Sequence, residues 1–239
     1  MQAPDITIAR DKRRMAEATI ERFVQHLPST RTVALPTGRT FIPEVYGAIA
    51  ALCNDGLISF EGKIVFLLDE FYPIGSHDEA GNGAYIRKHL FSRIAKQPER
   101  IFIPAARDAE SARRTIEAYD AALEEYAPVD LLMAGVGANG HVANNEPGSA
   151  PDLTTRIVDL TPETIAASNA PANRAITMGL KTILGARVIL AAAAGADKAE
   201  ALCKALKGPV TDAVPASHLQ HFQGSLHLVL DEAAARLLR

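Results

Sequence analysis

The 239-residue chain contains no tryptophan and only two cysteines, and aromatic residues make up 5% of it. Cys53 and Cys203 lie far apart in apolar, helical surroundings, without the C-x-x-C spacing of a zinc or redox site. A disulfide framework needs more cysteines in a shorter chain. We therefore expect both cysteines to be core residues and expect no cysteine-held metal.

Neither sign of charge is in large excess, since 25 Lys and Arg stand against 28 Asp and Glu, for a net charge of -3. The longest basic run is the triplet 12–14, so nothing indicates a nucleic-acid partner. No apolar run approaches the ~20 residues of a membrane span. Residues 1–10 include Pro4, Asp5 and Arg10 and lack the apolar centre of a signal peptide. We expect a cytoplasmic protein with no membrane partner, and no oligomeric state is predicted.

Hydrophobic residues make up 48% of the chain, enough for one sizeable core, and we expect residues 1–239 to form a single domain. Short apolar runs typical of buried strands recur along it. They are residues 32–35, 64–68, 101–103, 131–134, 188–191 and 226–230. Segments with helical periodicity lie between them, one over residues 20–27 and another over residues 116–126. The alternation predicts an α/β fold with a doubly wound, mostly parallel sheet, helices on both faces, and ligands at the carboxyl ends of the strands.

The first polar motif, residues 35–40 (LPTGRT), follows a predicted strand and precedes a predicted helix. Thr37, Gly38, Arg39 and Thr40 would present backbone N–H groups and hydroxyls at a helix N-terminus, where an anion is favoured. The motif fits a phosphate. An ordinary N-capped turn between strand and helix is the alternative.

The second motif places Asp69 and Glu70 directly after the strand at residues 64–68. Because side chains alternate along a strand, one carboxylate can enter a crevice while the other anchors the structure. Asp69 is placed to act as a base and Glu70 to support it. A solvated strand end is the plain alternative, and a metal site that adds His77 and Asp78 is disfavoured because the ligand spacing matches no known motif.

The third motif, residues 135–141 (GVGANGH), matches the dinucleotide fingerprint G-x-G-x-x-G, and Asp159 follows at about the usual separation. That site requires a helix that starts in the loop, whereas Pro147 and Gly148 interrupt the pattern within two turns. We therefore expect no nicotinamide cofactor. The loop instead places His141 five residues before Glu146, a pairing suited to proton transfer near neutral pH.

The fourth motif, residues 195–198 (GADK), follows the strand at residues 188–191 and opens a helix. A lysine in the first turn of a helix opposes the helix dipole unless an anion compensates it. Lys198 is therefore a candidate anion clamp, with a solvated lysine as the alternative.

Together these strings, with the N-E-P of residues 145–147, occur in the order found in the glucosamine-6-phosphate deaminase family, which the chain resembles over nearly its whole length. That family belongs to a superfamily shared with 6-phosphogluconolactonase. The resemblance implies an aldose-ketose isomerisation coupled to loss of ammonia, from glucosamine 6-phosphate to fructose 6-phosphate. It implies a phosphorylated sugar as the small-molecule partner, no cofactor and no metal.

The resemblance also implies roles for the motif residues. His141, supported by Glu146, would open the sugar ring, and Asp69 would move the C2 proton to C1. The phosphate would be held by Thr37, Gly38, Arg39, Thr40 and Lys198. Glu70 and Gly137 complete the substrate-binding set, and Asn139 joins the catalytic group.

The chain departs from the family pattern in several places. Asn139 stands where some deaminases have aspartate, so the relay around the imidazole has one carboxylate, Glu146. Ala170 stands where deaminases carry a phosphate-gripping arginine, and residues 81–83 (GNG) replace a Ser-Tyr element. Of the family's allosteric pocket only Arg156 is recognisable.

Three other functions remain open from the sequence. A 6-phosphogluconolactonase-like hydrolase would use the same histidine to activate water, but such enzymes typically lack the N-E-P string, so Glu146 discriminates between the two. A non-catalytic sugar-phosphate regulator would keep Thr37, Thr40 and Lys198 and lose the proton-transfer residues. A coenzyme A transferase or ribose-phosphate isomerase with a related fold is the third alternative, since fold does not fix function.

Overall fold

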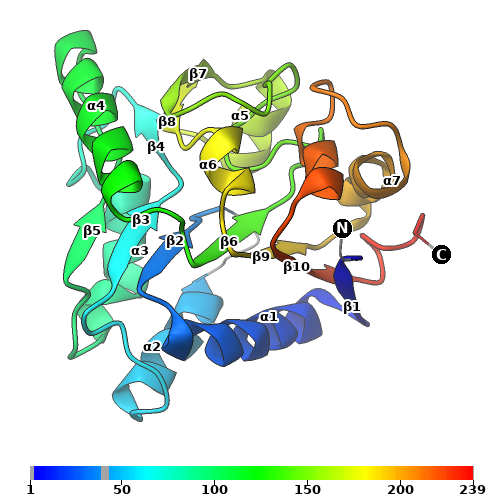
Figure 1. Cartoon of the computed structure of the whole chain (residues 1–239), viewed down its shortest axis with the longest axis horizontal. Helices are drawn as coiled ribbons and strands as arrows, with labels where there is room; N and C mark the ends of the chain where they lie inside the picture. Colours follow the sequence, from blue (N-terminus) through cyan, green and yellow to red (C-terminus); the bar gives the residue numbers. More distant parts are fainter. Residues whose placement is uncertain (1–2, 39–42, 239) are drawn as a thin grey trace.

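The computed structural model describes residues 3–38 and 43–238, and within them seven parallel strands form the central sheet, in the order β1-β10-β9-β6-β2-β3-β5 (Figure 1). The strands are β1 (Asp5–Ala9), β2 (Thr32–Leu35), β3 (Ile64–Leu67), β5 (Arg100–Phe102), β6 (Leu131–Gly135), β9 (Val188–Ala193) and β10 (Ser225–Asp231). Six of the seven coincide with the predicted apolar runs to within two residues. The predicted α/β class with a mostly parallel sheet is confirmed.

Helices cover both faces of this sheet because successive residues of each buried strand point to opposite sides. Val33 and Leu35 of β2 pack in one cluster, and Ala34 between them packs in the other. The first cluster is covered by α1 (Lys12–His26), α2 (Pro43–Asn54) and α3 (Asn82–His89). The second is covered by α4 (Ala109–Glu125), α6 (Leu180–Leu184) and α7 (Ala199–Lys207). Figure 1 shows these two helical layers below and above the sheet.

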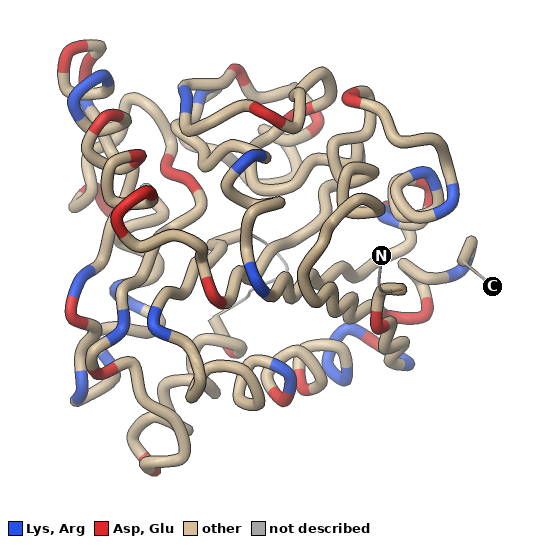
Figure 2. Tube along the Cα trace, viewed as in Figure 1, with Lys and Arg blue, Asp and Glu red and all other residues tan. Residues whose placement is uncertain are grey.

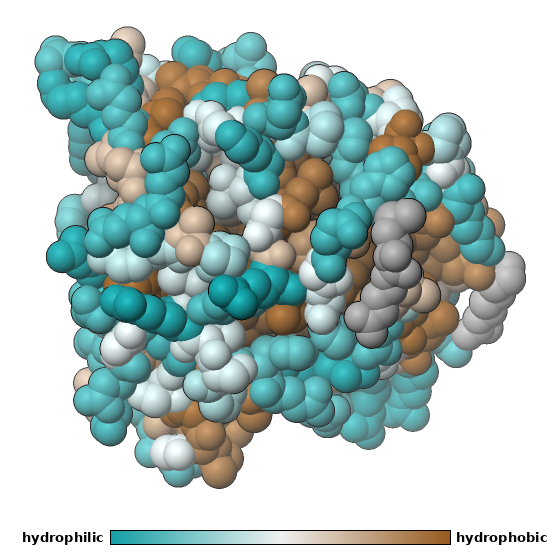
Figure 3. All heavy atoms as spheres, viewed as in Figure 1, coloured by the Kyte–Doolittle hydropathy of each residue, from teal (hydrophilic) through white to brown (hydrophobic). Residues whose placement is uncertain are grey.

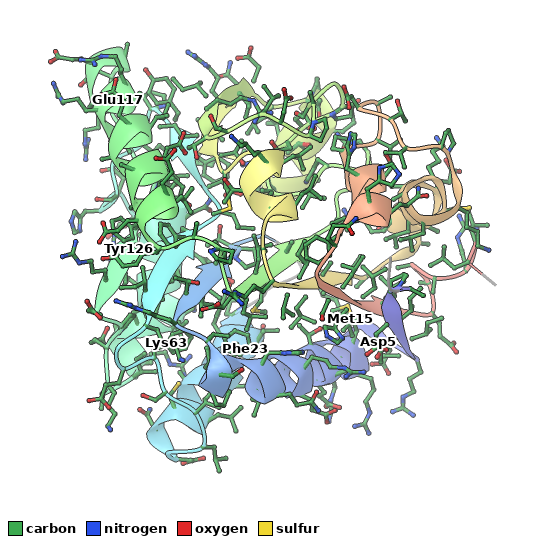
Figure 4. The ribbon with its side chains drawn as sticks, in the orientation of Figure 1. Asp5, Met15, Phe23, Lys63, Glu117 and Tyr126 are labelled. Carbon is green, nitrogen blue, oxygen red and sulfur yellow. The ribbon has the colours of Figure 1, made fainter. Side chains whose placement is uncertain are left out.

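The amphipathic pattern decides which side of each helix is buried. Met15 and Phe23 of α1 are almost fully buried and lie on the side of the helix that faces the sheet (Figure 4). Charged residues of both signs are interspersed along the outer helices, as α4 illustrates, while the strands within the sheet are mostly uncharged (Figure 2). On the face shown in Figure 3, hydrophobic areas are broken up by hydrophilic ones.

A smaller sheet was not predicted. Three antiparallel strands form it in the described part of the chain, in the order β4 (Asp69–Tyr72), β8 (Arg174–Thr177) and β7 (Arg156–Asp159). These strands are short, and β4 and β7 carry charged residues on half-buried positions, so they give no apolar run. β1 was missed for a similar reason, since Ile6 and Ile8 of this edge strand are exposed. One residue, Leu68, separates β3 from β4, so Asp69 lies where the chain leaves the main sheet.

The two cysteines depart partly from the prediction. Both are unpaired, and both are half-buried and not fully enclosed in the core. Burial raises the pKa of the Cys53 thiol to about 11, which leaves it protonated and unreactive near neutral pH. Among residues 3–38 and 43–238, no helix has the length and apolar character needed to cross a membrane.

Candidate active site

A cavity of about 510 Å³ lies at the carboxyl ends of the parallel strands, where the segments after β1, β2, β3, β6 and β9 meet. It brings together residues from all four polar motifs. The predicted residues that line it are Thr37, Gly38, Asp69, Gly137, His141 and Lys198. Glu70, Asn139 and Glu146 are not among the lining residues, and Arg39 and Thr40 lie outside the described residues.

Asp69 is held by a contact that the sequence did not reveal. The side-chain amide of Asn82, in the first turn of α3, donates a hydrogen bond of 2.6 Å to Asp69 Oδ1 and another of 3.2 Å to the Asp69 carbonyl. Burial and the adjacent charge of Glu70 raise the pKa of Asp69 to about 7, against the opposing effect of the Asn82 bond. Asp69 therefore exchanges protons near neutral pH, as a general base requires.

Glu70 points away from the cavity and is fully buried. Its carboxylate accepts hydrogen bonds from the backbone N–H groups of Phe71 at 2.8 Å, Asn82 at 2.8 Å and Gly83 at 2.7 Å. A Cβ on Gly81 would lie 3.0 Å from the same carboxylate. Glu70 thus fixes the start of α3, and with it the amide of Asn82, and it makes no direct contact with the cavity.

We expect Glu70→Gln to lower the free energy of unfolding by about 2 kcal/mol, because an amide NH₂ would face a backbone N–H and leave a buried donor unsatisfied. Urea denaturation of the purified proteins measures the change. Glu61→Gln is the matched control, since Glu61 is exposed and forms its ion pair with Lys96, which is exposed as well. Equal stability of the Glu70 and Glu61 variants would contradict the anchoring role.

The tautomer of His141 follows from its contacts with Asn139. The Asn139 amide nitrogen donates to Glu146 Oε2 at 2.7 Å, which turns Asn139 Oδ1 toward His141 Nδ1 at 2.8 Å. An amide oxygen can only accept, so Nδ1 carries the proton and the other ring nitrogen, Nε2, is free to accept one. Thr164, which lines the cavity, places its hydroxyl 3.4 Å from Nδ1.

Glu146 lies behind the imidazole, 7% exposed, with Oε2 at 3.7 Å from His141 Nδ1. Burial raises the pKa of this carboxyl, but the neighbouring His141, Thr164 and Asn139 outweigh it and lower the pKa to about 2. Glu146 is therefore a fixed negative charge beside the imidazole.

The loop that carries these groups has no regular structure. Residues 136–155, all of which the structure describes, contain no helix, so the helix that a dinucleotide site would need after Gly140 does not form. Asn145 is fully buried and donates to the carbonyls of Val142 and Met178, at 3.0 and 2.9 Å. Arg156 donates to Asn145 and Ser149. These bonds replace the missing helical ones and fix the loop.

The backbone of Gly137 lies so close to the His141 ring that no side chain fits at this position. A Cβ at this position would lie 2.3 Å from Cε1 of His141, so the imidazole rests directly on the glycine backbone. The second glycine of the G-x-G string therefore leaves the space in which the histidine ring packs against the backbone.

Lys198 also lines the cavity. It is the last residue of the 3-10 turn η3 (Ala196–Lys198) and the N-cap of α7, so it lies directly before that helix and not within its first turn as predicted. Gly195 begins this turn with a φ of +101°, which favours glycine, and its N–H donates to Asp231. The Lys198 side chain is 17% exposed, with Nζ 3.8 Å from the Asp197 carboxylate.

The sequence analysis missed many of the residues that line the cavity, and three polar ones that bear on the site are Lys12, Asn82 and Thr164. Each belongs to the first turn of a helix or its neighbourhood, where a polar residue is ordinary. The G-N-G string around Asn82 was the one visible signal, because two glycines beside a polar residue indicate a tightly approached turn.

Comparison with known proteins adds independent information. The family described as glucosamine-6-phosphate isomerases/6-phosphogluconolactonase matches residues 8–228. The glucosamine-6-phosphate deaminase of Rhodopirellula baltica is 41% identical over 214 residues, which cover 86% of this chain and 84% of that protein. The glucosamine-6-phosphate deaminase of Leuconostoc citreum is 34% identical over 224 residues, with 90% and 92% covered.

Solved structures agree with these matches. A monomeric glucosamine-6-phosphate deaminase superposes with a TM-score of 0.89 at 26% identity, covering 98% of this chain and 99% of that one. A 6-phosphogluconolactonase from Trypanosoma brucei superposes with a TM-score of 0.82 at 20% identity over the whole of both chains, which is a likeness of fold.

Proposed function

Because the chain belongs to the glucosamine-6-phosphate isomerase/6-phosphogluconolactonase family, we propose that it converts glucosamine 6-phosphate and water to fructose 6-phosphate and ammonia. The observation that carries the proposal is the pairing of two different proton-transfer groups, Asp69 and His141, on one cavity that also contains Lys198. The curated relatives cited above are deaminases, and the chain spans most of their length.

Ring opening is the step we assign to His141. Its Nε2 has no proton in the neutral form, because Asn139 holds the proton on Nδ1. Nε2 can therefore take the proton of the anomeric hydroxyl and return it to the ring oxygen, which breaks the ring C–O bond and leaves the open aldehyde. Glu146 stabilises the imidazolium that exists between the two transfers.

Proton transfer between carbons is the step we assign to Asp69. As a carboxylate it takes the C2 proton of the open sugar to give an enolamine, and it then returns the proton to C1. The C2 centre becomes an imine, and water adds to it and expels ammonia to leave the ketone. Thr37, Gly38 and Lys198 would hold the phosphate and so keep C2 within reach of Asp69. We assign Arg39 and Thr40 to the same phosphate contact.

The decisive assay incubates the purified protein with glucosamine 6-phosphate, galactosamine 6-phosphate and 6-phosphogluconolactone and measures ammonia, ketose and acid release. We expect ammonia and ketose in equal amounts from an aminosugar phosphate. Acid release from the lactone without ammonia from either aminosugar would replace the deaminase assignment by the lactonase. Sugar phosphates are made and consumed in the cytoplasm, where we propose that the enzyme acts.

Lys198→Ala should raise KM for the phosphorylated substrate roughly 10- to 100-fold and leave kcat nearly unchanged, because a charged contact to the phosphate acts in ground and transition states alike. Steady-state ammonia release measures both constants. Lys204→Ala, on the same helical segment but outside the cavity lining, is the control. An unchanged KM would remove Lys198 from the phosphate site.

A further inference from the structure

A second lysine, Lys12, lines the same cavity as Lys198. It is the first residue of α1, directly after the turn that follows β1, so it enters the cavity from a different strand end. The four polar motifs do not include it, and its segment carries none of the sequence strings on which the family resemblance rests. Two lysines from opposite ends of the chain therefore face one space.

The ion pairs around Lys12 distinguish it from its basic neighbours. Arg10 pairs with Asp11, while Arg13 and Arg14 both pair with Glu17. Lys12 makes no ion pair or side-chain hydrogen bond with any residue that the structure describes, and it is exposed to the cavity. An unpaired ammonium group on a cavity wall is free to bind an anionic ligand.

The opposite wall of the cavity shows why a second cation matters. It is formed by the end of α5 (Pro162–Ser168) and the residues after it, of which Asn169 and Pro171 line the cavity. Ala170, where the family resemblance implies an arginine for the phosphate, lies between them. No positive side chain comes from that wall.

The charge balance of the cavity also favours an additional cation. Its lining includes the carboxylates Asp69, Glu79 and Asp197, and a phosphate monoester adds close to two further negative charges at pH 7. Among the described residues that line the cavity, Lys198 is the other lysine, and its Nζ lies 3.8 Å from the Asp197 carboxylate, so it offsets only part of this charge. Arg39, which we also assign to the phosphate, lies outside the described residues, and a further cation reduces the repulsion that a ligand phosphate meets.

We propose that Lys12 is a phosphate-binding residue of this enzyme that, together with Lys198, supplies the positive charge that an arginine would supply from the segment around Ala170. The inference rests on the proposed function, because it takes the phosphate of the sugar as the anion. It makes Lys12 a determinant of specificity for phosphorylated over unphosphorylated sugars.

The test measures two quantities on the wild type, Lys12→Ala, Lys12→Arg and Arg13→Ala. The first is KM for glucosamine 6-phosphate, and the second is the calorimetric Kd of fructose 6-phosphate compared with that of fructose. We expect Lys12→Ala to raise KM and the fructose 6-phosphate Kd about 5- to 10-fold with little change in kcat, as suits one exposed charge. Lys12→Arg should recover most of the loss. Added salt should shrink the difference, because the contact is open to solvent.

Arg13→Ala is the matched control, since it removes the same charge one residue away at a side chain that pairs with Glu17 outside the cavity. If Lys12→Ala and Arg13→Ala weaken binding equally, or Lys12→Ala lowers kcat and leaves Kd unchanged, the assignment of Lys12 is wrong. If the wild type releases no ammonia, the proposed function fails. The Kd comparison still decides whether Lys12 binds phosphate, and equal affinity of the wild type for fructose and fructose 6-phosphate would reject it.

Discussion

Asp69→Asn should reduce turnover at least ~100-fold and leave the affinity for fructose 6-phosphate nearly intact, because a positioned base contributes at least that much to rate. The amide keeps the size of the side chain, and its oxygen can still accept the hydrogen bond from Asn82, but it cannot take the C2 proton. Exchange of that proton with deuterated solvent should therefore disappear. Ammonia release and nuclear magnetic resonance of the recovered substrate measure the two effects.

The pH dependence gives an independent check on the same residue. Since the pKa of Asp69 is raised to about 7, kcat/KM of the wild type should fall as pH drops below 7, where the carboxyl becomes protonated. Normal C2 exchange in Asp69→Asn would show that Asp69 is not the base. If the residual activity of the variant still falls below pH 7 as the wild-type activity does, a group other than Asp69 causes that fall.

The raised pKa of Asp69 also has a consequence for stability. The folded protein keeps this proton up to pH 7, whereas the unfolded chain releases it near pH 4, so the folded state binds more protons between these values. Its contribution to stability therefore falls as pH rises through that window. Asp69→Asn should be more stable than the wild type at pH 8, and the difference should vanish toward pH 4, as thermal denaturation at both pH values can show.

Glu146→Gln should reduce ammonia release roughly 100-fold, because it removes the negative charge 3.7 Å from His141 that favours the imidazolium formed during ring opening. The wild-type carboxyl, with its pKa near 2, is charged at every working pH, so the loss should be present across the whole profile. Glutamine can still accept the 2.7 Å hydrogen bond from Asn139 through its one oxygen, while the longer 3.3 Å bond from the Thr161 backbone N–H to the other Glu146 oxygen would be lost.

A control separates the two chemistries that this fold is known to carry. Hydrolysis of a lactone needs one general base and no protonated imidazole, so any lactone hydrolysis by this protein should be affected far less by Glu146→Gln. Glu163→Gln, an exposed change at the start of α5, serves as the structural control. Full ammonia release by Glu146→Gln would exclude Glu146 from the ring-opening step.

Much of the fold was predictable because the central strands are buried on both faces. Such strands are continuous apolar runs, visible without any partner, as residues 188–191 and 226–230 show. The small sheet was not predictable, since β4 and β7 carry polar residues and pair only with strands distant in sequence. The edge strand β1 leaves Ile6 and Ile8 exposed, so its sequence lacks the continuous apolar run of a buried strand.

The sequence alone determined the family, the class of fold and the chemically active residue types, since motif order and the alternation of apolar runs are properties of the chain itself. Only the tertiary structure decided what each polar residue contacts. Asp69 and Glu70 are neighbours of similar chemistry, yet one faces the cavity and the other binds three backbone N–H groups, because the chain leaves the main sheet at that point. The position of Lys12 beside the cavity likewise depends on β1 and β9 ending at the same edge of one parallel sheet, which no local pattern records.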